Sequence, residues 1–327
     1  MQLSIIRQTP AVSILLTLLL VSAAFVRFAL APYGDELVAG QIVVPGAWVD
    51  GFQSSYPIWG WILSAVLFLM NAIAIGKVTT SLNLYPARTT ISIPLFIITA
   101  CGIFISADSL SVGVAIYCAI QMLRHFGTCY IKGTHLKFAL FAGLYAGLAP
   151  LFYAPTVAFV VLLPLAIVIF GFSWREIIVM TTGLLLPLAT TSYIDWLLGG
   201  EFLNTSTALW SAITTPTGYT PWASESVVAL TMMGLMLFIT LCGITTFIGE
   251  KRSVAVRPRT IFLFLIVTLL VACAAFALPS ATAGLYALVA IPISTLAPLM
   301  LLKLRDEISN LVILILVILL ILHSFVA

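Results

Sequence analysis

The sequence predicts an all-α fold, a polytopic bundle of transmembrane helices that forms a single integral membrane domain over residues 1–327. Three observations predict it. The chain is 62% hydrophobic and 8% charged, whereas a soluble domain carries about 25% charge so that polar surface can face water. The apolar residues form continuous runs that are long enough to span a bilayer. These runs do not alternate with polar residues, so the spans are predicted to be helices and not the strands of a barrel.

The hydropathy pattern predicts about eleven spans. The first follows a basic residue, Arg7, and resembles a signal peptide in its order of basic, apolar and small residues. It is predicted to remain in place as a signal anchor. The spans are predicted at residues 9–30, 57–76, 90–107, 109–123, 137–150, 154–172, 177–198, 226–248, 260–278, 281–302 and 308–326.

The charges in the loops predict the orientation of the helices. All but one of the 14 Lys and Arg residues fall on one side: Arg7, Lys77, Arg88, Arg124, Lys132, Lys137, Arg175, Lys251, Arg252, Arg257, Arg259, Lys303 and Arg305. The other side holds Arg27 and most of the 11 acids: Asp35, Glu36, Asp50, Asp108, Asp195, Glu201 and Glu225. Because cytoplasmic loops retain Lys and Arg, the N-terminus is predicted to be cytoplasmic and the C-terminus periplasmic.

Two predicted outer loops, 31–56 and 199–225, are long enough to hold further structure. The second is predicted to contain a short helix lying flat on the membrane surface. The apolar residues that have the spacing of such a helix are Phe202, Leu203, Leu209, Trp210 and Ile213.

Two spans carry signals about packing. Gly143 and Gly147 form a G-x-x-x-G pattern, which predicts close packing against another helix of the same chain. The last span contains LVILILVILLIL and has no small residue there. It is predicted at the edge of the bundle, facing lipid or another membrane subunit.

Several functional classes are disfavoured by what the chain lacks. The five cysteines form no C-x-x-C pair and are predicted to be reduced packing residues. His125, His135 and His323 are too few and too scattered for a histidine-ligated metal site. No P-loop motif occurs, and no carboxylate is predicted near the bilayer middle, where ion-coupled transporters place one. A net charge of +3 gives no indication of a nucleic-acid partner.

The stretch RFALAPYGDELVAG, residues 27–40, contains the candidate site. One explanation is structural: Arg27 extends to the headgroups or pairs with Asp35, and the acids are solvated loop residues. The other is catalytic. Asp35 or Glu36 would take a proton from an acceptor hydroxyl, and Arg27 would bind a phosphate through paired hydrogen bonds. Asp50 together with Asp35 would hold a divalent metal; beyond that metal the sequence indicates no cofactor.

This arrangement resembles the GT-C fold of membrane glycosyltransferases. The likeness lies in the number of spans, the acidic pair Asp35 and Glu36 after the first span, and the surface helix predicted in a later outer loop. The resemblance implies transfer of a sugar from a polyprenyl-phosphate carrier at the outer membrane face. It is a resemblance of architecture and assigns no residue by alignment.

A second resemblance lies elsewhere in the chain. Residues 71–88 and 123–187, with the pieces APLFYAP and FSWREIIVMTTGLLLP, resemble an uncharacterised family of bacterial multi-pass inner-membrane proteins, a domain of unknown function. The likeness implies a helical bundle in the bacterial cytoplasmic membrane and brings no catalytic residues.

Two functions therefore stay open: a GT-C-like glycosyltransferase, or a non-catalytic subunit or scaffold of an envelope assembly or transport complex that meets its partners through the last span. Membrane lipids are expected partners in both. The basic stretch 250–259 would hold anionic headgroups through Lys251, Arg252, Arg257 and Arg259, although the topology rule alone explains these cations.

Overall fold

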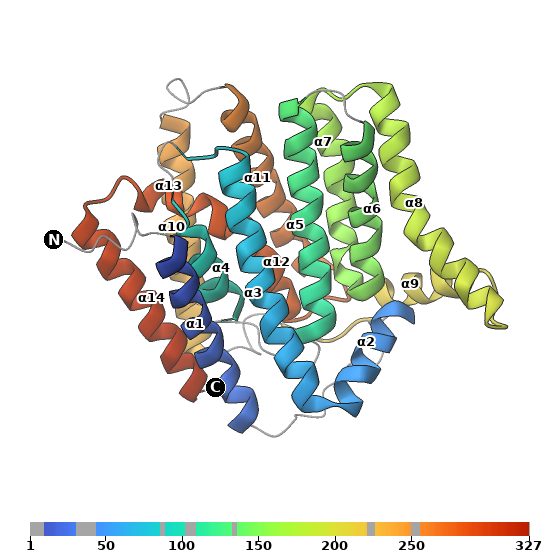
Figure 1. The fold of residues 1–327 in the computed structure, drawn as a ribbon, viewed down its shortest axis with the longest axis horizontal. Helices are drawn as coiled ribbons and strands as arrows, with labels where there is room; N and C mark the ends of the chain where they lie inside the picture. Colours follow the sequence, from blue (N-terminus) through green and yellow to red (C-terminus); the bar gives the residue numbers. More distant parts are fainter. Residues whose placement is uncertain are drawn as a thin grey trace.

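The computed structural model describes residues 10–30, 44–85, 89–101, 109–132, 136–220, 226–249 and 256–326, and these residues form helices without strands. Figure 1 shows the helices arranged as one bundle, with two short helices at its lower end. The first half contains α1 (Pro10–Leu30), α2 (Val44–Ser55), α3 (Pro57–Ser81), α4 (Ser92–Cys101), α5 (Ser109–Lys132), α6 (Leu136–Phe152), the 3₁₀ helix η2 (Ala154–Val161) and α7 (Leu162–Phe170). The second half contains α8 (Trp174–Leu197), α9 (Asn204–Thr214), α10 (Val227–Gly249), α11 (Val256–Ala274), the 3₁₀ helix η3 (Ala275–Ala277), α12 (Gly284–Leu296), α13 (Pro298–Leu301) and α14 (Asp306–Val326).

The predicted all-α fold is confirmed for the described residues. Seven of their helices are long and apolar enough to cross a membrane. Each predicted span overlaps a helix; 154–172 is divided between η2 and α7, and 281–302 between α12 and α13. Several of the remaining apolar helices are shorter than a full span, so the number of crossings stays a prediction.

The core lies around α4 and α12. Every residue of α12 is buried, and so is every residue of α4, which packs against it. α1, α3 and α11 also contact this pair. The Tyr85 hydroxyl donates to the Thr295 carbonyl at 2.6 Å and joins the end of α3 to α12. The centre of the bundle is therefore filled by two helices whose entire surfaces are covered by protein.

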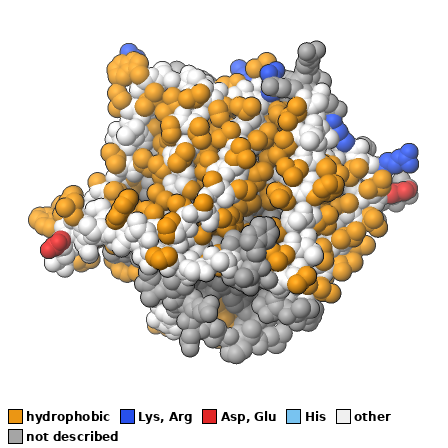
Figure 2. Space-filling view, turned by 180° about the vertical axis from the view of Figure 1, so that it is seen from behind, with side chains coloured by type: hydrophobic (Ala, Val, Ile, Leu, Met, Phe, Trp, Pro, Cys, Tyr) orange, Lys and Arg blue, Asp and Glu red, His pale blue; other side chains and the backbone are white. Residues whose placement is uncertain are grey.

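α8 and α14 lie at the edges of the bundle and expose large apolar side chains. Exposed residues of α14 include Leu311, Leu314 and Ile318. Figure 2 shows a broad hydrophobic surface of this kind across one face of the molecule. The predicted position of the last span at the bundle edge is confirmed.

The contact between α6 and α8 depends on glycine. A Cβ on Gly143 would lie 2.1 Å from the Met180 carbonyl oxygen, and one on Gly147 would lie 2.2 Å from that of Leu184. From the other side, a Cβ on Gly183 would lie 2.4 Å from the Leu140 carbonyl oxygen. Real Cβ atoms do not approach so closely, so the two backbones meet because side chains are absent. The packing predicted from G-x-x-x-G is confirmed, and the partner is α8 of the same chain.

The ends of the helices separate the charges. The described helix ends that carry Lys77, Arg124, Lys137 and Arg175 gather at the upper end in Figure 1, whereas α2 and α9 lie at the opposite end. Figure 2 shows several Lys and Arg side chains at this upper end and a further basic group lower down at the far right, beside an acid. Basic and acidic loops at opposite ends of the bundle are what we expect if successive loops alternate between the two sides of the membrane.

A reporter fused after Ala327 is expected to read as periplasmic. The reason is that the end of the bundle rich in Lys and Arg is retained in the cytoplasm. Paired alkaline phosphatase and fluorescent-protein fusions measure the side directly. Fusions placed after Ser253, in the basic loop, are the control and should give the cytoplasmic result. The same result at both positions would show that the number of crossings is wrong.

Candidate functional site

α2 places a polar face against the bundle and an apolar face outward. Asp50 and Gln53, three residues apart on one side of the helix, are 8% and 2% exposed. Trp48 and Phe52, on the other side, are 59% and 40% exposed. A helix on the surface of a soluble protein has the opposite arrangement, with its apolar face buried. This reversed pattern suits a helix whose outer face meets lipid.

Gln53 fixes α2 to the ends of α3 and α5. Its Nε2 donates to Ser109 Oγ at 3.3 Å, and its Oε1 accepts from the Leu110 backbone N–H at 3.3 Å. Ser109 Oγ in turn donates to Ser64 Oγ at 3.0 Å. A Cβ on Gly60 would lie 2.6 Å from Gln53 Cγ, so glycine is what admits the glutamine side chain. α2 is therefore held in one rotational setting.

That setting determines where Asp50 points. Both of its carboxylate oxygens are shielded from solvent, on a helix that contacts α3, α5 and α6. Taking a carboxylate out of water is costly, and buried ionisable groups concentrate at functional sites as well as in structural ion pairs. The structure therefore buries the side chain of Asp50, a predicted site residue, against other helices.

The other predicted site residues are described less fully or not at all. Asp35 and Glu36 lie outside the described residues. Arg27 is near the end of α1, and its backbone is helical, but its side chain is outside the described part. The predicted closeness of Arg27, Asp35 and Glu36, and the predicted metal site of Asp35 with Asp50, therefore stay predictions.

Metal ligands do not converge in the described part of the chain: it contains no group of three or more His, Cys, Asp or Glu residues that could hold an ion. Asp50 alone would supply too few oxygens for a divalent cation, which takes six or more ligands, water included. Any such site would depend on acids outside the described residues, such as Asp35.

α9 lies at the same end of the bundle as α2. The loop 199–225 contains a helix at Asn204–Thr214, and its predicted position on the membrane surface stays a prediction. Trp210 is 69% exposed on it, and Leu203 just before it is 64% exposed. The Asn204 side-chain amide donates to Asp195 Oδ2 at 2.9 Å, which ties the start of α9 to the end of α8.

The predicted lipid-headgroup residues are divided between described and undescribed segments. Lys251 and Arg252 lie outside the described residues. Arg257 and Arg259 stand in the first turn of α11, where Arg257 is exposed and Arg259 half-buried. Their position at the basic end of the bundle is compatible with headgroup contact, which stays a prediction.

Two further ionisable groups, one buried and one half-buried, lie outside the predicted site. Glu176, in the first turn of α8, is 3% exposed and accepts from the Ser173 backbone N–H at 2.7 Å, so capping accounts for it. His125 lies among three aromatic rings of α6 at residues 138, 141 and 145. In the sequence, the spacing of these three aromatic residues indicates that they share one face of a helix. The cysteines are all free, as predicted.

Comparison of the chain with family models, with curated proteins and with solved structures finds no match.

Proposed function

We propose that this protein is a multi-pass protein of the bacterial inner membrane and transfers a sugar from a polyprenyl-phosphate carrier at the end of the bundle that carries α2 and α9. The observation that carries the proposal is Asp50: a carboxylate withdrawn from water on a helix whose opposite face is apolar. A site beside such a helix is open to a lipid-borne donor from the membrane and to a polar acceptor from the aqueous side.

The proposed reaction needs a base for the acceptor hydroxyl and a cation for the carrier phosphate. The acceptor hydroxyl attacks the anomeric carbon of the sugar, a new C–O bond forms, and the bond to the carrier phosphate breaks. The carboxylate of Asp35 takes the hydroxyl proton, and polyprenyl phosphate leaves as the anion. Arg27 would bind that phosphate, because its guanidinium matches two phosphate oxygens. Glu36 is the second candidate base, and Asp50 would help to position the reacting acids from its place on α2.

The test is a transfer assay with protein purified in detergent and a polyprenyl-phosphate sugar that carries a radioactive label. Release of the label from the lipid phase is measured with and without a soluble hydroxyl acceptor. Asp50→Asn is expected to lower the rate by about 10²-fold, since a small misplacement of reacting groups costs that much. The melting temperature of the variant is measured beside its rate.

Asp195→Asn is the matched control, because it makes the same change at the same end of the bundle, where Asp195 accepts from Asn204. It should keep the rate within about twofold of the parent, because Asp195 has no part in the proposed reaction. No label release by the parent, or equal rates for the parent and Asp50→Asn, would contradict the proposal.

One observation favours the second candidate function, a non-catalytic subunit of an envelope assembly or transport complex. α14 lies at the bundle edge and its outward face carries Leu311, Leu314, Ile318 and Leu322, all exposed. A partner helix would cover that face, although lipid would satisfy it equally well. Cross-linking from Leu314 in native membranes separates the two: a discrete protein adduct supports a partner, and labelled lipid alone supports a bare edge.

A further inference from the structure

Three cations from three neighbouring helices lie near the basic end of the bundle: Lys77 on α3, Arg124 on α5 and Lys137 on α6. α5 packs against both α3 and α6. A Cβ on Gly113 would touch the Leu67 side chain, and one on Gly127 would touch that of Leu82. α3 and α5 thus run in the same direction, and Lys77 lies within about one helical turn of Arg124 along the bundle axis.

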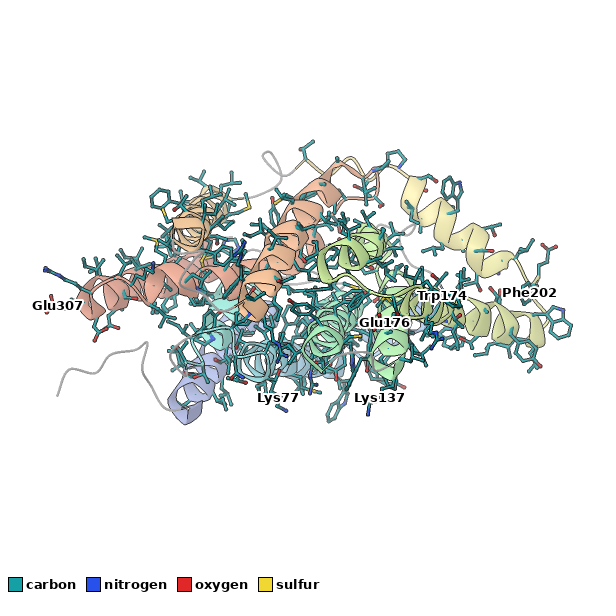
Figure 3. All side chains as sticks on the ribbon, turned by 90° about the horizontal axis from the view of Figure 1, so that it is seen from above. Lys77, Lys137, Trp174, Glu176, Phe202 and Glu307 are labelled. Atoms are coloured by element: carbon teal, nitrogen blue, oxygen red, sulfur yellow. The ribbon has the colours of Figure 1, made fainter. Side chains whose placement is uncertain are left out.

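α6 runs the other way and brings Lys137 to the same region. His125, next to Arg124, stacks on the rings of Phe138, Phe141 and Tyr145, with centroid distances of 5.9, 5.4 and 5.6 Å. The Lys137 ammonium lies 5.1 Å from the centre of the Phe138 ring. Figure 3 shows Lys77 and Lys137 directed outward along the same edge of the bundle.

Negative charge is missing from these helices. α3, α5 and α6 contain no Asp or Glu. Lys77 and Lys137 are exposed, and Arg124 and His125 are half-buried. The region is therefore a positive surface whose own helices provide no carboxylate to balance it.

The His125 ring has one unsatisfied atom. Its Nδ1 is buried and has no hydrogen-bond partner. A buried N–H without an acceptor is costly, so the proton is expected on Nε2 and not on Nδ1. Nε2 then has a hydrogen to donate to a group outside the stack.

We propose that Arg124, Lys137 and His125, with Lys77 beside them, bind the phosphate headgroup of an anionic phospholipid. The phosphate would accept from the Arg124 guanidinium, the Lys137 ammonium and His125 Nε2–H. One acyl chain would lie against the exposed side of Phe141, which is 42% exposed and one helical turn from Lys137 toward the bilayer interior. Basic sites between membrane helices bind anionic lipids by this combination of charge and apolar surface.

A membrane lipid is favoured over a soluble anion by the apolar surface. Phe141 and Leu136 are both exposed on α6 beside the cations, and a free phosphate would leave them uncovered. The topology rule accounts for cations at this end of the bundle, but it does not require the aromatic stack beside Arg124 and Lys137.

The test is native mass spectrometry of the full chain in detergent, titrated with phosphatidylglycerol or with phosphatidylcholine of the same acyl chains. The parent is expected to bind its first phosphatidylglycerol at least about tenfold more tightly, the value of one charge-assisted hydrogen bond. Lys137→Gln and His125→Phe should each lower that affinity by roughly three- to tenfold. Phosphatidylcholine binding should not change. His125→Phe keeps a ring in the stack, and Lys137 is exposed, so both variants should fold.

Arg175→Gln is the matched control, because Arg175 is a cation at the same end of the bundle, 6.0 Å from the Trp174 ring and outside the histidine stack. It should retain the preference of the parent. Equal affinities of the parent for the two lipids would overturn the proposal. So would an equal loss in Arg175→Gln, or displacement of the lipid by millimolar inorganic phosphate.

Discussion

Gly143→Leu is expected to destabilise the protein by about 2–3 kcal/mol, the upper part of the range for overpacked sites. The reason is that the first added carbon would already lie 2.1 Å from the Met180 carbonyl oxygen. A backbone carbonyl within a helix cannot rotate away as a side chain can, so α6 and α8 must move apart. That separation would also loosen the contacts made at Gly147 and Gly183. Thermal unfolding in detergent and the amount of protein recovered from membranes measure the effect.

Gly234→Leu is the control for this change. Gly234 lies within α10, and no atom comes within 4 Å of a Cβ placed there. The same substitution should therefore be neutral or slightly stabilising, since glycine in a helix interior costs about 0.5–1 kcal/mol relative to alanine. If Gly143→Leu melts at the temperature of the parent, the close contact between α6 and α8 is wrong.

Asp35→Asn is expected to lower sugar transfer by about 10²–10⁴-fold, the usual loss when a general base is removed. Asparagine keeps the shape of aspartate but cannot accept the proton of the acceptor hydroxyl. Expression and melting temperature should remain those of the parent, because a loop carboxylate adds little to stability. The transfer assay described for Asp50→Asn gives the rate.

Glu201→Gln serves as the control for Asp35→Asn. Glu201 is an exposed acid between α8 and α9, at the same end of the bundle, and its replacement should leave the rate unchanged. A non-catalytic subunit would make Asp35→Asn silent as well, while changes on the outward face of α14 would release a partner. If Asp35→Asn transfers sugar at the rate of the parent, Asp35 is not the base of the proposed reaction.

The positions of the helices could be predicted from the sequence because the bilayer imposes them. Backbone groups in lipid must bond within their own segment, so a continuous apolar run becomes a helix whatever it packs against. The helix on the loop 199–225 and the close approach at Gly143 and Gly147 were predictable for a similar reason: both depend on residues close together in one segment. The charges at the loop ends are equally local.

Which helices lie at the centre was decided by the tertiary structure. α4 and α12 are wholly buried, while α10 and α14 are about as apolar and only a minority of their residues are buried. Apolar side chains are equally compatible with lipid and with protein, so hydropathy does not distinguish an edge helix from a central one.

The candidate site divides in the same way. The sequence by itself placed Arg27 near the end of the first span, Asp35 and Glu36 just after it, and Asp50 in the same segment before the next span. Only the tertiary structure buried Asp50, because the glutamine one turn further along α2 bonds to serine and backbone groups of other helices. It alone joined His125 to the rings of α6. Hydrogen bonds and ring contacts between helices depend on the rotation of each helix about its axis, which is set by its neighbours and not by its own sequence.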